Sequence, residues 1–302
     1  MGPAWLRGVF PPIATAFAAD GSLRPAPTGF LECLRDARLD GVVALGSNGE
    51  AAHLTESERL RSIQWLRGGL PQPLRLIAGT GAESTVATIE RTRAAAAEGA
   101  EAALVIAPSY FRGQLTAEAL RRHYHAVADA SPIPILIYNV PVHMGYDLGV
   151  DWIARLAGHP NIAGLKDSSG DIARLPTLRA RLGPDFVLLT GAGEKLVDAL
   201  TAGADGAIVG LANLAPAACA GIRQAWLVKD AELARRQQRA ISPLGEALTR
   251  GYGVPGLKAG LRMLGYDHGD PRPPLPPLPA AELATLRRLL EEAGLVPRAL
   301  AS

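Results

Sequence analysis

A lysine at position 166 ends a short apolar run and stands directly before a group of turn-forming residues. Residues 161–171 are NIAGLKDSSGD, in which residues 162–165 suit a buried strand and residues 167–170 suit a turn. Lysine seldom leaves water without a partner, and only four of the 31 basic residues are lysines. A desolvated lysine can lose its proton and attack a carbonyl carbon, which an arginine cannot do. The alternative is a structural lysine that extends to solvent or pairs with Asp167.

Other polar residues also follow apolar runs. Residues 46–50 are GSNGE, where two glycines flank Ser47 and Asn48. Such a turn can offer backbone and side-chain donors to a carboxylate, although an ordinary turn uses the same residue types. Tyr138 ends another apolar run, where a packed core tyrosine is the alternative, and Tyr110 follows a third run. An amine that attacks a ketone, together with phenols that move protons, would form a coherent chemical set.

The elements that must position these residues alternate along the chain. Eight short apolar runs, each followed by an amphipathic stretch, predict an α/β protein with the (β/α)8 TIM-barrel fold. The expected strands begin near Val9, Gly41, Leu74, Ala102, Ile133, Ile162, Phe186 and Gly206. The expected helices cover residues 29–37, 56–67, 84–98, 117–130, 150–157, 171–182, 194–202 and 216–228. Active sites of such barrels lie at the carboxyl ends of the strands, where the polar residues above would meet.

The periodicity becomes purely helical after the eighth repeat. We expect a catalytic barrel domain over residues 1–229 and a C-terminal helical extension over residues 230–302. Three helices are predicted in the extension, over residues 231–249, 255–264 and 280–293. The proline-rich residues 271–279 predict an extended polyproline linker, with a peptide-binding segment as the alternative.

Composition narrows the class of protein. The 302 residues are 48% hydrophobic and 20% charged with a net charge of +2, which indicates a folded protein without a nucleic-acid or membrane partner. Cys33 and Cys219 form no disulfide framework, and no export signal precedes the barrel, so we expect a cytoplasmic protein. No cluster with metal-ligand spacing is present. His123 and His125 lie two residues apart on an expected helix, and we interpret both as surface residues.

The motifs resemble those of the class I, Schiff-base aldolases of the dihydrodipicolinate synthase and N-acetylneuraminate lyase superfamily. The resemblance covers essentially the whole chain, and GxxGE, YNVP and GLKD are specific to the superfamily. Several stretches are most similar to the eukaryotic type of 4-hydroxy-2-oxoglutarate aldolase. These are residues 46–50, 83–88, 109–113, 131–141, 159–171 and 253–258.

The resemblance implies roles for individual residues. Lys166 would form the Schiff base, and Tyr138 would be the general acid and base. Ser47 and Asn48 would hold the substrate carboxylate and position Tyr138. Tyr110 would complete a proton relay from a neighbouring subunit, which implies a homodimer or homotetramer.

Further implied roles concern the substrate pocket. Ser168 would contact the distal part of the substrate, and Gly191 and Gly210 would line the pyruvate pocket. The substrate would be a small 2-oxo acid, and neither a metal nor an organic cofactor is required.

One departure from the superfamily pattern bears on the substrate. Dihydrodipicolinate synthases have an arginine where this chain has His143, and they usually have GTTGE in place of GSNGE. His143 is either a partly charged substitute for that arginine or an ordinary loop residue. Loss of the guanidinium should weaken a bidentate carboxylate contact. The resemblance therefore favours an aldolase that cleaves 4-hydroxy-2-oxoglutarate to pyruvate and glyoxylate.

Several alternatives remain open. The nearest is a 4-hydroxy-tetrahydrodipicolinate synthase, which condenses pyruvate with aspartate semialdehyde. Another 2-oxo acid aldolase or dehydratase of the same superfamily would use the same lysine. A barrel that only binds an oxo acid as a sensor would keep the lysine adduct but show no turnover.

Overall fold

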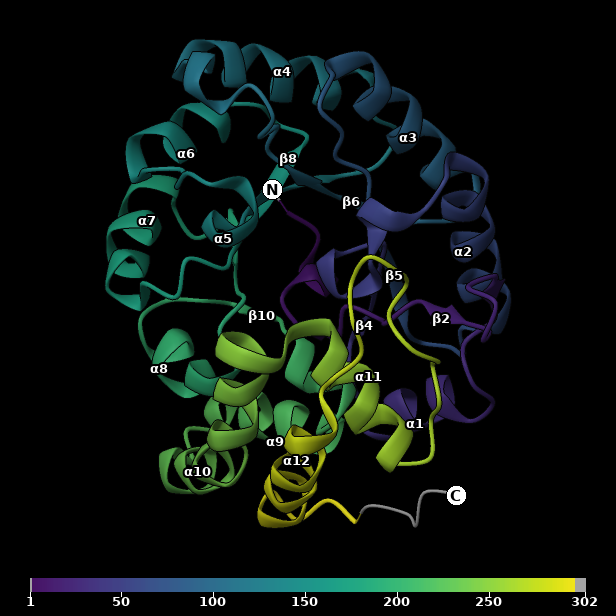
Figure 1. Ribbon diagram of the computed structural model, residues 1–302. Coiled ribbons are helices and arrows are strands. Elements are labelled where there is room, and N and C mark those ends of the chain that lie inside the picture. The colour runs from purple at the N-terminus through teal and green to yellow at the C-terminus, as the bar shows by residue number, and fades with distance from the viewer. Residues whose placement is uncertain (1, 297–302) are drawn as a thin grey trace.

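Eight parallel strands form one closed barrel in the computed structural model, which describes residues 2–296; Figure 1 shows the helices arranged around it. The strands follow one another in the order β1-β10-β9-β8-β7-β6-β5-β4. The last gap closes between the segment after β1 and β4, where Val43 N–H donates to Pro11 O and Ile13 N–H donates to Val43 O, both at 2.9 Å. The predicted (β/α)8 barrel is therefore confirmed.

The strands are short and almost wholly buried, because helices cover the barrel on the outside and side chains fill it on the inside. Their burial explains why the sequence shows continuous apolar runs instead of alternation. The eight strands are β1 (Val9–Phe10), β4 (Gly41–Ala44), β5 (Arg75–Gly79), β6 (Ala102–Ile106), β7 (Ile135–Asn139), β8 (Ile162–Asp167), β9 (Val187–Thr190) and β10 (Gly206–Ile208).

The helices that surround the barrel agree closely with the amphipathic stretches. They are α1 (Phe30–Asp36), α2 (Glu56–Gly69), α3 (Thr85–Ala97), α4 (Ala117–Ala130), α5 (Pro141–Met144), α6 (Val150–Leu156), α7 (Leu175–Leu182), α8 (Leu196–Thr201) and α9 (Pro216–Leu227). Helix α2 begins at a capping box, in which the Thr55 side chain accepts from Glu58 N–H and the Glu58 carboxylate accepts from Thr55 N–H. The short helix α5 and the small antiparallel hairpin of β2 (Ala16–Phe17) and β3 (Leu23–Arg24) lie outside the expected alternation.

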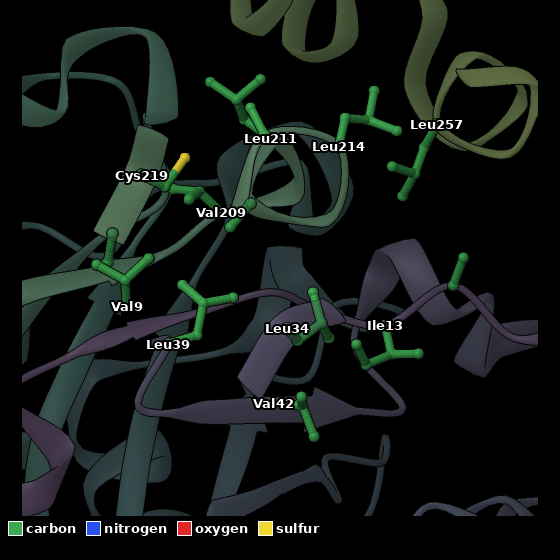
Figure 2. Close-up of a cluster of buried hydrophobic side chains, with 14 of the residues drawn as sticks. Val9, Ile13, Leu34, Leu39, Val42, Val209, Leu211, Leu214, Cys219 and Leu257 are labelled. Atoms are coloured by element: carbon green, nitrogen blue, oxygen red, sulfur yellow. The ribbon is translucent and has the colours of Figure 1, made fainter. Parts of the chain in front are cut away.

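Three further helices follow the barrel and pack against it: α10 (Ala231–Ala247), α11 (Gly253–Met263) and α12 (Ala280–Glu292). A π-helical turn, Leu248–Tyr252, joins α10 to α11. Figure 2 shows part of this shared core, in which Leu257 of α11 and Leu214 belong to the same cluster of buried apolar side chains as Val9 of β1 and Val42 of β4. The C-terminal helices thus extend the hydrophobic core of the barrel.

The proline-rich segment is not the continuous extended linker that we expected. Leu275 N–H donates to Arg272 O at 3.2 Å, which closes a turn inside residues 271–279. Arg272 N–H donates to the carboxylate of Glu50, so the segment crosses the barrel at the end of β4 (Figure 1). Side-chain contacts with the barrel hold this segment in place, and these contacts override the backbone preference of proline.

Candidate active site

Lys166 and Tyr138 lie side by side at the carboxyl ends of two neighbouring strands. They are register partners on β8 and β7, and the Lys166 Nζ lies 4.1 Å from the centroid of the Tyr138 ring. Lys166 is 4% exposed and Tyr138 is 6% exposed. The barrel therefore places a buried amine against the face of a phenol, which is the environment that a nucleophilic lysine requires.

The two structural alternatives for Lys166 are wrong. Its side chain is buried and does not extend to solvent. Asp167 points to the opposite face of the strand, where its carboxylate accepts hydrogen bonds from Asn139 Nδ2 at 2.8 Å and from the backbone and side chain of Ser169 at 3.1 Å each. Arg174 Nε lies 3.6 Å from the same carboxylate.

The turn after β4 brings Ser47 next to Tyr138, with 3.3 Å between Ser47 Oγ and Tyr138 Oη. The turn is a short 3-10 segment, Ser47–Gly49, and left-handed residues stand on both sides of it. Leu45 has a φ of 57° and Glu50 a φ of 51°. Such backbone conformations cost about 1–3 kcal/mol each in residues other than glycine, and they are concentrated at functional sites.

Gly191 and Gly210 are glycines because polar side chains lie against their backbones. A Cβ at position 210 would lie 2.5 Å from Asn48 Nδ2, and one at position 191 would lie 2.7 Å from the Ser168 Cβ and closer still to its hydroxyl. The two glycines thus allow Asn48 and Ser168 to approach the strand ends.

A cavity of about 1240 Å³ opens at this end of the barrel. Eight of the nine candidate residues line it, namely Ser47, Asn48, Tyr138, His143, Lys166, Ser168, Gly191 and Gly210. Burial, and then the nearby charge of Lys166, lower the pKa of His143 below its usual value. His143 therefore offers the cavity a neutral imidazole at pH 7, which weakens its interpretation as a charged substitute for arginine.

Tyr110 lies outside the cavity of its own chain and is 76% exposed. Its ring packs edge-on against Phe111, with 4.9 Å between the ring centroids. The carboxylate of Glu83 fixes the loop, because it accepts from the backbone N–H groups of Ser109 and Tyr110 at 3.0 and 2.8 Å. Tyr110 therefore does not line the cavity of its own chain.

The outer wall of the cavity was not predicted from the sequence. The π-helical turn contributes Thr249 and Arg250, the proline-rich segment contributes Leu275, and Glu194 and Lys195 follow the end of β9. Glu194 is buried and accepts from Thr249 Oγ1 at 3.4 Å. The sequence signal that could have predicted Glu194 as a cavity residue is its position shortly after a strand.

The surface interpretation of His123 is also wrong. His123 is 7% exposed, its Nδ1 lies 2.9 Å from Thr85 Oγ1, and burial lowers its pKa to about 4. It shares a face of α4 with Leu120 and Val127, which are both buried in the barrel's outer layer.

Within residues 2–296, no group of three or more His, Cys, Asp and Glu residues gathers as metal ligands would. No helix in the same range is long and apolar enough to cross a membrane.

A closed parallel barrel with a buried lysine and a phenol at the carboxyl ends of adjacent strands defines an enzyme of the TIM-barrel class. The sequence model of the dihydrodipicolinate synthetase family matches residues 5–293. The chain belongs to this family. The family's members are lyases that form Schiff bases with pyruvate, and the protein is such an enzyme.

Individual relatives carry two different activities in their names. The chain is 35% identical over 292 residues to a probable mitochondrial 4-hydroxy-2-oxoglutarate aldolase of Emericella nidulans, covering 94% of both chains. It is 37% identical over 289 residues to a 4-hydroxy-tetrahydrodipicolinate synthase of Stenotrophomonas maltophilia, covering 94% of this chain and 95% of the relative.

A solved structure agrees with the same fold. The dihydrodipicolinate synthase of Acinetobacter baumannii, crystallised with pyruvate, superimposes with a TM-score of 0.89 at 34% identity. The match covers 96% of this chain and all of that one.

Proposed function

We propose that this lyase cleaves 4-hydroxy-2-oxoglutarate into pyruvate and glyoxylate through a Schiff base on Lys166. The observation that carries the proposal is the buried Lys166 Nζ, which lies 4.1 Å from the Tyr138 ring centroid. A neutral amine in this position attacks the C2 ketone, and loss of water gives an iminium that withdraws electrons from the C3–C4 bond.

Tyr138 moves the protons in this mechanism. As its phenolate it accepts the proton of the C4 hydroxyl, the C3–C4 bond breaks, and glyoxylate leaves. The electron pair of that bond forms an enamine, whose C3 then takes up the proton that Tyr138 accepted, which restores the phenolate. Water adds to the resulting iminium and releases pyruvate and free Lys166. Ser47, with its Oγ 3.3 Å from Tyr138 Oη, is the first partner in the proton relay.

The cavity contains groups for both carboxylates of the substrate. Ser47 and Asn48 hold the C1 carboxylate at the turn after β4, and Ser168 and His143 contact the distal C5 carboxylate. A neutral imidazole has one donor and one acceptor nitrogen, which suits a small acid with a hydroxyl group beside its distal carboxylate. The name of the Emericella nidulans relative supports this substrate.

Condensation of pyruvate with aspartate semialdehyde is the second candidate, and the Stenotrophomonas maltophilia relative supports it. Parallel assays separate the two reactions. Pyruvate release from 4-hydroxy-2-oxoglutarate should exceed condensation with aspartate semialdehyde by at least tenfold in kcat/KM. The reverse ratio would overturn the assignment of the substrate and leave the Schiff base intact.

We also propose that Tyr110 completes the site of a second copy in a homodimer or homotetramer. Its 76% exposure and its ring contact with Phe111 make it available to a partner. Lys166→Met and Tyr110→Phe chains should each be impaired alone. Co-expressed, they should regain activity, because a mixed dimer contains one site with both native residues. A mixed oligomer that forms without regaining activity would contradict the proposal.

A further inference from the structure

The carboxylate of Glu50 lies buried behind the turn that carries Ser47 and Asn48. Lys258 Nζ lies 2.6 Å from Glu50 Oε1, and both side chains are 1% exposed. The other carboxylate oxygen accepts from Arg272 N–H at 2.8 Å and lies 3.3 Å from His53 Nδ1. A charge this deeply buried persists only when such partners are present.

Lys258 comes from α11, far along the chain from the turn. Its ammonium also donates to Asp270 O at 3.1 Å. It lies 4.3 Å from the centroid of the Phe17 ring, and the Arg272 guanidinium lies 4.3 Å from the same centroid. One buried cation therefore connects the turn after β4, the β2–β3 hairpin and the C-terminal extension.

The turn needs support of this kind because its backbone is unfavourable on both sides. Leu45 and Glu50 are left-handed, with φ values of 57° and 51°. The Ser47 hydroxyl points toward Tyr138, and the Asn48 amide lies against Gly210. The Thr15 hydroxyl donates to the Gly49 carbonyl, and the carboxylate of Glu50 adds the contacts with Lys258, Arg272 and His53. Small movements of Glu50 would therefore displace the two donors.

We propose that Lys258 is a positioning residue, which holds Glu50 so that Ser47 and Asn48 meet the carboxylate of the bound oxo acid. This inference rests on the proposed Schiff-base function and adds a role for the C-terminal extension in it. Lys258 does not touch the substrate. It is absent from the residues that line the cavity, whereas Glu50 is one of them.

The test compares pyruvate with acetone, a ketone of the same reactivity class that lacks the carboxylate. Both form a Schiff base that borohydride reduces to a stable adduct. In Lys258→Met, the pyruvate concentration for half-maximal trapping should rise at least tenfold, while the rate of trapping by acetone stays within twofold of the native rate. A purely structural loss would affect both ketones alike. Lys229→Met is the matched control, because Lys229 is exposed and should leave both values unchanged.

Removal of one buried charge can impair folding, so a second variant is needed. The double variant, Glu50→Gln with Lys258→Met, removes both charges, so no carboxylate stays buried without its partner. It should show the same selective loss of pyruvate trapping. Loss of less than tenfold for pyruvate in a folded variant, or a parallel loss for both ketones, would overturn the positioning role. Failure of the native protein to trap either ketone on Lys166 would instead refute the Schiff-base function itself.

Discussion

The replacement Tyr138→Phe tests the proton-transfer step with little disturbance of the fold. It removes one oxygen, whose contact with the described residues is Ser47 Oγ at 3.3 Å, and it keeps the ring that faces Lys166. Loss of such a hydrogen bond costs about 0.5–1.5 kcal/mol of stability. Loss of a general acid and base costs about 10²–10⁴ in rate, or about 2.7–5.5 kcal/mol in the barrier. Turnover should therefore fall far more than stability.

The assay measures pyruvate release in the steady state and pyruvate trapping by borohydride at equilibrium. The variant should lose turnover by about 10²–10⁴ but should still form the adduct, because Lys166 remains buried beside the ring. Tyr124→Phe is the matched control. Its hydroxyl is also buried and donates to Val105 O at 2.9 Å, so this variant should lose stability and keep its turnover. Native turnover in Tyr138→Phe would refute the role of the phenol.

Three further predictions follow from particular contacts. Gly191→Ala should lower activity at least tenfold with a smaller loss of stability, measured by thermal unfolding, because the new Cβ would lie 2.7 Å from the Ser168 Cβ; native activity would contradict the close contact. Hydrogen bonds from Arg272 lower the pKa of Glu58 to about 2, so its contribution to stability is present above pH 4.5 and disappears as the pH falls to about 2. Unfolding midpoints of Glu58→Gln should therefore lie below the native ones at pH 7 and converge with them across that range, and a constant difference would contradict this. Burial lowers the pKa of His268 to about 4, so the unfolded chain binds a proton that the folded chain does not, and stability should fall from pH 6.5 to 4; His268→Gln should flatten this slope in the same measurement.

The barrel could be predicted from the sequence because each strand is a continuous apolar run that is buried on both faces. The same argument placed Tyr138 and Lys166 at one end of the barrel, since parallel strands end at the same edge. Their register partnership on β7 and β8 agrees with that expectation.

Features that depend on distant contacts were not predictable. The β2 and β3 strands have two residues each, too few for any periodic pattern. The buried pair of Glu50 and Lys258 joins residues that lie far apart in the chain, and neither residue type predicts burial.

His123 could have been placed correctly, because it lies three residues after Leu120 and four before Val127 on one helical face.

The outer wall of the cavity was missed for a similar reason. Thr249 and Arg250 belong to a π-helical turn within an otherwise regular helical pattern. Leu275 reaches the cavity because Arg272 is held by Glu50 and Glu58. Proline content predicted an extended conformation for this segment, whereas the contacts of Arg272 with Glu50 and Glu58 hold it against the barrel.

Covalent trapping of pyruvate tests the central claim most directly. The native protein should be incubated with pyruvate and borohydride, digested, and the modified peptide mapped by mass spectrometry. Because the chain contains only four lysines, each possible adduct can be assigned without ambiguity. We predict a single pyruvate-derived adduct on Lys166, absent from Lys166→Met. An adduct on Lys195, Lys229 or Lys258 in place of Lys166, or no adduct at all, would contradict the account.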